Sequence, residues 1–446
     1  MAAAAPQLEE LVDLEPFSPS LFLDLPPTPH GDDPNDDDLI LPFISRMLME
    51  DDIDDKFFYQ FPDHPALLHA QQPYAQILDA PSDDTTTNSS DDSKDLKLLF
   101  SAADNMEMLN MAFLKGREEA NKLCTSTVDF LKAYKLFAAA CCIKKVSFIF
   151  SNKTILDAVA GKRKLHIVDY GLSYGFQWPG LFKCLSEREG GPPEVRITGI
   201  DFPQPGFRPA DQIEETGRRL SNCARQFGVP FRFQAIAAKW ETVRREDLHL
   251  DREEEEEEEE EVLVVNCLHF LNALQDESVV VDSPSPRDMV LNNIRDMRPH
   301  VFVQCVVNGA YGAPFFLTRF RETLFFYSSQ FDMLDATIPR DNDERLLIER
   351  DILGRWALNV IACEGADRVD RPETYKQWLV RNHRAGLTQL PLQPQVVELV
   401  RDKVKKLYHK DFVIDVDHNW LLQGWKGRIL YAMSTWVADR DHKSLF

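Results

Sequence analysis

The sequence predicts an α/β protein with a doubly wound, mostly parallel sheet that ends in an antiparallel hairpin, beside a partial helical cap and a long N-terminal tail. Strand-like and helix-like runs alternate between residues 164 and 306, which favours right-handed crossovers between parallel strands. The apolar run 164–169 ends in a carboxylate and continues into a turn with Gly171 and Gly175. Such a turn joins a buried parallel strand to a helix, often where a sheet binds its ligand.

The N-terminal tail, residues 1–95, holds 22 acidic and three basic side chains, which accounts for most of the net charge of −23. Its Asp-, Pro-, Ser- and Thr-rich composition predicts disorder, because too little apolar surface can be buried to offset chain entropy. Apolar clusters flanked by acidic residues are typical of an activation segment that docks on coactivators. The predicted docking residues are Leu39, Phe43, Met47, Phe57 and Phe58. A tail that only solubilises the protein is the alternative.

Residues 96–150 are expected to form the remnant of a helical cap. Apolar residues recur there at helical spacing, which predicts a buried stripe rather than a cofactor contact. The stripe consists of Phe130, Tyr134, Phe137, Cys141 and Phe148. The α/β body is predicted over residues 151–438, followed by a short tail at 439–446.

Within the body, the elements are read from apolar runs and their breaks. Strands are predicted at 164–169, 194–200, 231–236, 262–266 and 301–306, with helices at 176–188, 209–227 and 286–297. Helices dominate from residue 315 to residue 406, and strands return at 411–416, 419–423 and 428–436. Gly424 to Gly427 supply a turn for a terminal antiparallel hairpin. A parallel sheet completed in this way is methyltransferase-like.

Several classes of protein lack support in the sequence. It contains no run of eighteen apolar residues, so neither a transmembrane helix nor a membrane partner is expected. The N-terminus lacks the pattern of a secretory signal, which favours an intracellular protein. The eight cysteines have no zinc-type spacing, so no metal site is predicted. No hydrolase elbow or zinc-protease motif is present, and no catalytic residue is assigned.

A cofactor crevice is the main alternative. In an S-adenosylmethionine-dependent methyltransferase, Asp169 would end the first strand, Asp201 would end the second strand as a ribose acceptor, and Asn266 would line the same crevice. The turn after Asp169 departs from G-x-G-x-x-G, because Leu172 and Tyr174 stand where a backbone should approach a ligand. No cofactor is therefore predicted.

Several ordered blocks resemble the GRAS family of plant transcriptional regulators, and the acidic tail resembles that of its scarecrow-like branch. The VHIID-like block is Leu165, His166, Ile167, Val168 and Asp169; the PFYRE-like block includes Pro314, Phe315, Arg321 and Glu322; the SAW-like region includes Trp378, Gly386, Trp425, Ser434 and Trp436. Residues 262–271 resemble the second leucine-rich region. The resemblance covers about residues 126–438.

One departure from the family pattern concerns the first leucine-rich region, which should precede Thr127. Here residues 96–122 run almost directly into that helix. The chain is therefore predicted to lack a helical segment that contributes to the cap and to dimerisation in the family.

The resemblance implies a nuclear transcription regulator without catalysis. It would act by sequence-specific DNA binding, through DNA-binding partner proteins, or through both, and homodimers and heterodimers both remain open. Two other hypotheses stay open at this point: the methyltransferase described above, and an interaction scaffold whose body never touches DNA.

Overall fold

The computed structural model describes residues 127–204, 207–249, 261–279, 284–313 and 315–439. Apart from residues 361–363, these belong to one compact unit. The predicted acidic tail with its five docking residues lies outside the described residues, and so does Pro314 of the PFYRE-like block.

A nine-stranded sheet with the order β3-β2-β1-β4-β5-β9-β8-β7 forms the centre of this unit, and β6 also pairs with β9. Strands β1 to β5 are parallel, and the strands that follow them are antiparallel. Their bounds are β1 Lys164–Tyr170, β2 Glu194–Asp201, β3 Phe231–Ala237, β4 Val262–Leu268, β5 Val301–Val307, β6 Leu387–Gln389, β7 Phe412–Asp417, β8 Trp420–Trp425 and β9 Arg428–Ala438. The predicted mostly parallel, methyltransferase-like sheet is confirmed.

The antiparallel part is larger than the predicted hairpin. It is a three-stranded meander in which β9 pairs with both β5 and β8, and the short strand β6 was not predicted. The turn consists of Lys426 and Gly427 alone, both with positive φ, 46° and 82°, which suits a two-residue hairpin. Gly424 instead lies within β8 at a register shift. A Cβ there would lie 2.3 Å from the Arg428 carbonyl oxygen, so the close strand approach requires glycine.

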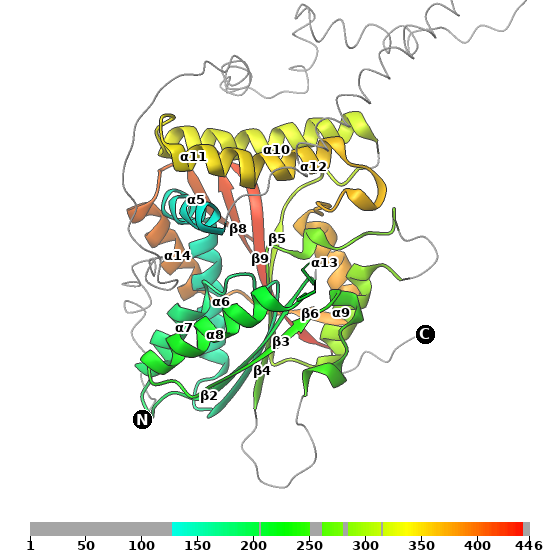
Figure 1. Cartoon of the computed structure of the whole chain (residues 1–446). Helices are drawn as coiled ribbons and strands as arrows, with labels where there is room; N and C mark the ends of the chain where they lie inside the picture. Colours follow the sequence, from blue (N-terminus) through cyan, green and yellow to red (C-terminus); the bar gives the residue numbers. More distant parts are fainter. Residues whose placement is uncertain (1–126, 205–206, 250–260, 280–283, 314, 440–446) are drawn as a thin grey trace, which may run out of the picture. The chain divides into compact units, whose positions relative to one another are not determined.

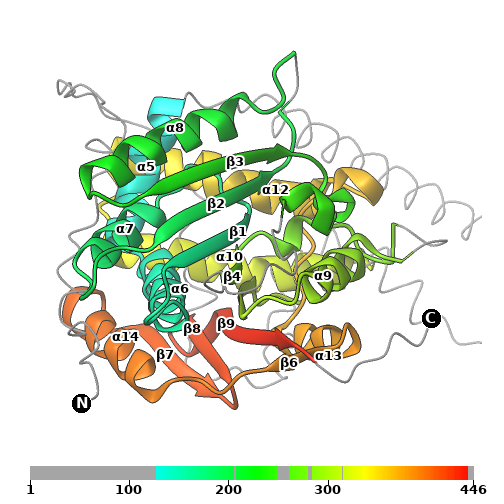
Figure 2. The same ribbon diagram turned by 90° about the horizontal axis from the view of Figure 1, so that it is seen from below.

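Helices cover both faces of the sheet, as Figure 2 shows. One face carries α6 Ile143–Ala158, α7 Trp178–Ser186, α8 Asp211–Gln226 and α14 Pro394–Leu407; the other carries α9 Pro286–Met297 and α13 Tyr375–Arg384. Two buried apolar clusters result, one on each face. Strands buried on both faces explain the near-continuous apolar runs at β1, β4 and β5.

A further helical layer lies across one end of the sheet (Figure 1). It contains α10 Phe316–Thr337, α11 Asp343–Leu347, a π-helical turn Ile348–Gly354 and α12 Arg355–Ala362, with α5 Thr127–Ala140 against α11. Tyr311, just beyond β5, packs on Phe326 and Tyr327 of α10. The layer therefore lies at the end where the parallel strands finish.

The apolar stripe predicted for residues 130–148 is divided between two helices with different neighbours. Phe137 and Cys141 are buried where α5 ends. Helix α6 then continues past residue 150, where the predicted cap ends, and packs on β4 and β5. The helical period alone could not show where one helix ends and the next begins, because both segments bury apolar residues in the same core.

Candidate functional site

The candidate site is the crevice at the carboxyl ends of β1 and β4, where the sequence placed Asp169 beside Asn266. The two residues are register partners in the parallel ladder. Asn266 Nδ2 donates to Asp169 Oδ1 at 2.8 Å, and Trp178 Nε1 donates to Asp169 Oδ2 at 3.0 Å. Both carboxylate oxygens thus accept a hydrogen bond from another side chain, and Asp169 is only 5% exposed.

Helix α6 contributes more polar groups to the same cluster. Ser151 Oγ donates to Asn266 Oδ1 at 2.7 Å, and Gln177 Nε2 donates to Ser151 Oγ at 2.9 Å and to Asn152 Oδ1 at 3.0 Å. All these residues are buried. We call Ser151, Asn152, Asp169, Gln177, Trp178 and Asn266 the crevice network. It joins α6, β1, the β1–α7 turn, α7 and β4 by hydrogen bonds between buried groups that are satisfied within the protein.

Burial governs the charge state of this cluster. It raises the pKa of Asp169 from 3.8 to about 7, although the hydrogen bonds from Asn266 and Trp178 lower the pKa and the nearby Asp201 raises it further. A carboxyl group with a pKa in this range resembles those of catalytic acids and bases. Here, however, its two oxygens are already used within the protein.

Asp201, the expected ribose acceptor, accepts hydrogen bonds from two nearby backbone N–H groups. Its carboxylate accepts from Ser173 N at 3.0 Å and from Phe202 N at 2.9 Å. Ser173 has a φ of 52°, a left-handed conformation that this hydrogen bond helps to hold. Asp201 therefore fixes the β1–α7 turn.

The two side chains expected to obstruct the crevice behave differently. Leu172 is buried and lies directly against Gly199 of β2, where a Cβ would be 2.6 Å from the leucine side chain. Tyr174 instead stacks on Phe176, with ring centroids 5.7 Å apart. Leu172 thus occupies the space over Gly199 of β2.

The VHIID-like block is strand β1, the central strand of the parallel ladder. Leu165 and Ile167 belong to the apolar cluster beneath α6 to α8, whereas Val168 belongs to the cluster on the opposite face. His166 is fully buried; its Nε2 lies 2.9 Å from Thr198 Oγ1, and its Nδ1 lies 3.7 Å from Glu261 Oε2. The apolar residues of the block pack in the two cores, and His166 and Asp169 form contacts with polar groups inside the protein.

The SAW-like residues lie on both faces of the sheet. Trp378 and Trp436 are buried in the cluster beside α9 and α13, and Trp436 Nε1 donates to Ser434 Oγ at 2.7 Å. Gly386 has a φ of 79° just after α13, a conformation that favours glycine at a helix end. Trp425 is buried on the opposite face and donates through Nε1 to Asp332 of α10. The structure therefore brings together three of the five residues.

The PFYRE-like residues lie at the start of α10 and do not form a cluster with the crevice. Phe315 is 65% exposed, and Arg321 lies 3.6 Å from Glu322 at a partly exposed position. Arg319, between them, is fully buried and pairs with Glu364. The burial of Arg319 was not predicted, because a single arginine does not change the spacing of the apolar residues around it.

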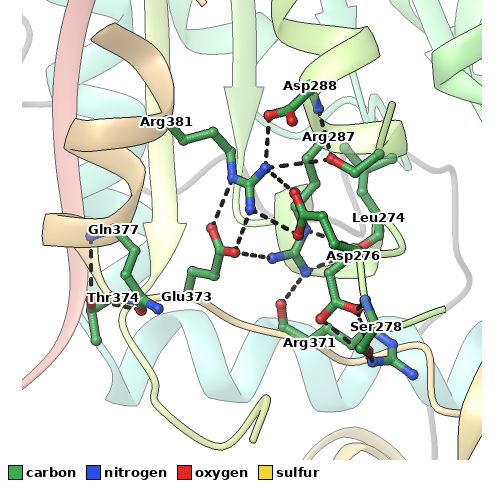
Figure 3. A network of polar contacts seen from close by, with 12 residues as sticks. Leu274, Asp276, Ser278, Arg287, Asp288, Arg371, Glu373, Thr374, Gln377 and Arg381 are labelled. Carbon is green, nitrogen blue, oxygen red and sulfur yellow. Dashed lines mark hydrogen bonds and ion pairs between the residues drawn. The ribbon is translucent and has the colours of Figure 1, made fainter. Parts of the chain in front are cut away.

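A larger feature that sequence reasoning missed is an ion-pair network that connects α9 with α13, shown in Figure 3. Arg381 contacts Glu373, Glu277 and Asp288, each through at least one pair at 2.7 Å. Arg287, fully buried, lies 3.0 Å from Glu373 and donates to the Leu274 carbonyl. The guanidinium groups of Arg287 and Arg381 also lie 5.7 and 5.9 Å from the centre of the Trp378 ring.

This ion-pair network binds distant segments of the chain together. Arg371 extends it to Asp276 at 3.1 Å. The hydrogen bond from Arg381 is the largest influence on Glu277 and lowers the pKa of that carboxyl to about 2. An indication was available in the sequence: Arg287 falls on a stripe of α9 that otherwise holds apolar residues such as Val290 and Ile294.

Among the residues that the structure describes, no three His, Cys, Asp or Glu side chains are arranged to hold a metal ion. No helix within the same ranges is both long and apolar enough to cross a membrane. The seven cysteines that the structure describes are all buried.

The strand order and the crevice network define a class of protein: a methyltransferase-like α/β fold in which buried polar side chains bond to one another at the carboxyl ends of β1 and β4. The model of the GRAS domain family matches residues 97–437, and the chain belongs to this family. The match begins before residue 126, where the sequence resemblance was placed, so it includes residues 97–126 as well.

Individual relatives agree with the family assignment. The chain is 54% identical to Scarecrow-like protein 9 and 52% identical to Scarecrow-like protein 11, both of Arabidopsis thaliana. Each match covers 314 residues, or 70% of this chain, and 42% and 50% of the respective relative. The chain therefore spans about half the length of these curated relatives.

A solved structure has the same fold. The crystal structure of SCL7 in Oryza sativa matches with a TM-score of 0.62 at 24% sequence identity, over 84% of this chain and 99% of that one. The fold class expected from the sequence is thereby confirmed.

The buried carboxyl of Asp169 predicts a specific dependence of stability on pH. The folded protein holds this proton up to about pH 7, whereas the group's ordinary pKa is 3.8. The folded state then binds more protons than the unfolded state between these values, so the free energy of unfolding should fall as pH rises through this interval. Urea unfolding from pH 4 to pH 8 measures it, and Asp169→Asn should flatten the slope.

The matched control is Asp415→Asn on β7, whose side chain is 64% exposed. It should leave the slope unchanged. An equally steep slope in Asp169→Asn would contradict the assignment of a buried proton to this residue.

The ion-pair network predicts unequal roles for two neighbouring arginines of α13. Arg381→Met should lower the free energy of unfolding by about 3 kcal/mol, because it leaves partly buried carboxylates without their shared cation. Arg384→Met removes a cation that is 62% exposed and lies 2.9 Å from Asp288, and should cost less than about 1 kcal/mol. Equal costs in urea unfolding would mean that burial does not distinguish the two sites.

Proposed function

We propose that the protein is a nuclear transcription regulator of the GRAS type and that its body is a non-catalytic scaffold. The observation that carries this proposal is the crevice network. Where a methyltransferase-like sheet would hold its cofactor, Asp169 accepts hydrogen bonds from Asn266 and Trp178 and is buried. A ligand there would have to break satisfied buried hydrogen bonds, which is costly.

The expected ribose acceptor supports the same conclusion. Asp201 is occupied by two backbone N–H groups, and Leu172 fills the space over Gly199. A cofactor would need the turn to open and both side chains to move. The S-adenosylmethionine-dependent methyltransferase using Asp169, Asp201 and Asn266 is therefore the less favoured function.

Membership of the family and the charge of the body support an interaction with DNA, either direct or through a partner protein. Outside residues 1–95 and the run of nine glutamates that ends at Glu261, the chain carries a small net positive charge. Such a body could approach DNA directly or bind another DNA-binding protein. The acidic tail would then recruit coactivators through its apolar clusters, and homodimers or heterodimers would be compatible with either route.

Calorimetric titration of the full chain with S-adenosylmethionine tests the scaffold proposal. No saturable heat is expected at cofactor concentrations up to the millimolar range, because the buried groups of the crevice network already bond to one another. Saturable binding that is lost in Asp169→Ala but kept in Asp415→Ala would overturn the proposal in favour of a methyltransferase.

The activation segment is tested with the full chain fused to a heterologous DNA-binding domain and a reporter gene. Replacing Phe43, Phe57 and Phe58 together by alanine should reduce reporter output about tenfold, as the loss of buried aromatic anchors does at other interfaces. The matched control replaces Thr85, Thr86 and Thr87 in the same tail. Equal output from both variants, at equal nuclear protein levels, would refute the assignment of these aromatic residues.

A further inference from the structure

Strand β3 is the terminal strand of the sheet on its parallel side, and among the described strands it pairs only with β2. Val195 N donates to the Pro230 carbonyl at 2.8 Å, and Ala238 N donates to the Asp201 carbonyl at 3.1 Å. Alternate residues of a strand direct their N–H and C=O groups to opposite sides. The backbone groups of Arg232, Gln234 and Ile236 therefore face β2.

The other residues of β3 present their backbone to the open side of the sheet. They are Phe231, Phe233, Ala235 and Ala237. Each offers one donor and one acceptor away from β2. An edge of this kind is a template for a further strand.

A hollow runs beside this edge, between β3 and α8. It has a volume of about 510 Å³ and is lined by one stripe of α8 and by two residues of β3: Glu214, Gly217, Arg218, Ser221, Asn222, Arg225, Phe233 and Ala235. Gly217 is necessary, because a Cβ there would lie 2.1 Å from the Phe233 ring. At 1.5 Å per residue, the stripe is about 16 Å long, the length of about five extended residues.

The charges around the hollow favour an acidic occupant. Its lining includes two arginines and one glutamate. Arg225 hydrogen-bonds the neutral amide of Asn222 at 3.0 Å, so its charge remains available to a ligand. Arg218 pairs with Glu215 while its side chain stays 66% exposed.

We propose that the β3–α8 edge binds an extended acidic peptide of a partner protein as an additional β-strand. Main-chain hydrogen bonds to the four outward-facing residues would set its register, and alternate side chains would enter the hollow. The proposal does not depend on the nuclear function.

Hydrogen exchange of the free full chain tests whether the edge is available. With residue-resolved mass spectrometry, the amides of Phe233 and Ala235 should exchange much faster than those of Gln234 and Ile236, which are bonded to β2. Slow exchange at all four would show that another part of the chain already covers the edge and would overturn the proposal.

A designed probe tests binding directly. It is a fluorescent nine-residue peptide of alternating valine and threonine with two aspartates at each end. Saturable binding in fluorescence anisotropy is expected. N-methylation of two valines and N-methylation of the two threonines remove amides from opposite edges of the probe, so one of these two peptides should bind about tenfold more weakly, because two main-chain hydrogen bonds are lost. Absence of binding, or binding by both N-methylated peptides equal to that of the unmodified probe, would overturn the proposal.

Charge reversal supplies the matched comparison. Arg225→Glu should weaken probe binding, and so should replacing the probe's aspartates by lysines. Arg401→Glu, on α14 next to β7 at the other end of the strand order, is the control and should bind the probe as the unaltered chain does. Equal effects of Arg225→Glu and Arg401→Glu, in variants with unchanged circular dichroism melting, would refute the assignment of this edge.

Discussion

The structure depends on one constraint: a carboxyl group lies at the centre of the sheet, and everything around it must satisfy that group. Asp169 occupies the end of β1, and its oxygens accept from Asn266 of β4 and Trp178 of α7. These bonds fix the distance between two strands and the position of α7. A buried carboxyl without partners would be costly, so the surrounding helices cannot shift independently.

The crevice network lies where sheets of this kind often bind a ligand. The strand order places the carboxyl ends of β1 and β4 together, where many α/β proteins bind ligands. Here Gln177, Ser151 and Asn152 occupy that position with their own hydrogen bonds. Fold alone therefore does not indicate catalysis.

The opposite face is organised by charge. Arg381 and Arg287 lie near the same tryptophan and share Glu373. A cluster of this sort contributes specificity of arrangement as well as stability, because each arginine has several fixed partners. It ties α13 to α9, while the antiparallel strands close the sheet beside β5. The two ends of the sheet therefore differ: one ends in a meander, and the other ends at β3.

The order of the elements and the parallel character of the sheet could be predicted from local periodicity, because apolar runs and glycine turns mark the strands and their ends. The same pattern predicted that Asp169, Asp201 and Asn266 lie at strand ends. Their roles could not be predicted in this way, since the partners of Asp169 are 9 and 97 positions away in the chain. The same holds for Arg381, whose partner Glu277 is 104 residues distant. The partners of buried polar and charged side chains come from segments far apart in the chain, and a local sequence pattern does not indicate which segments meet.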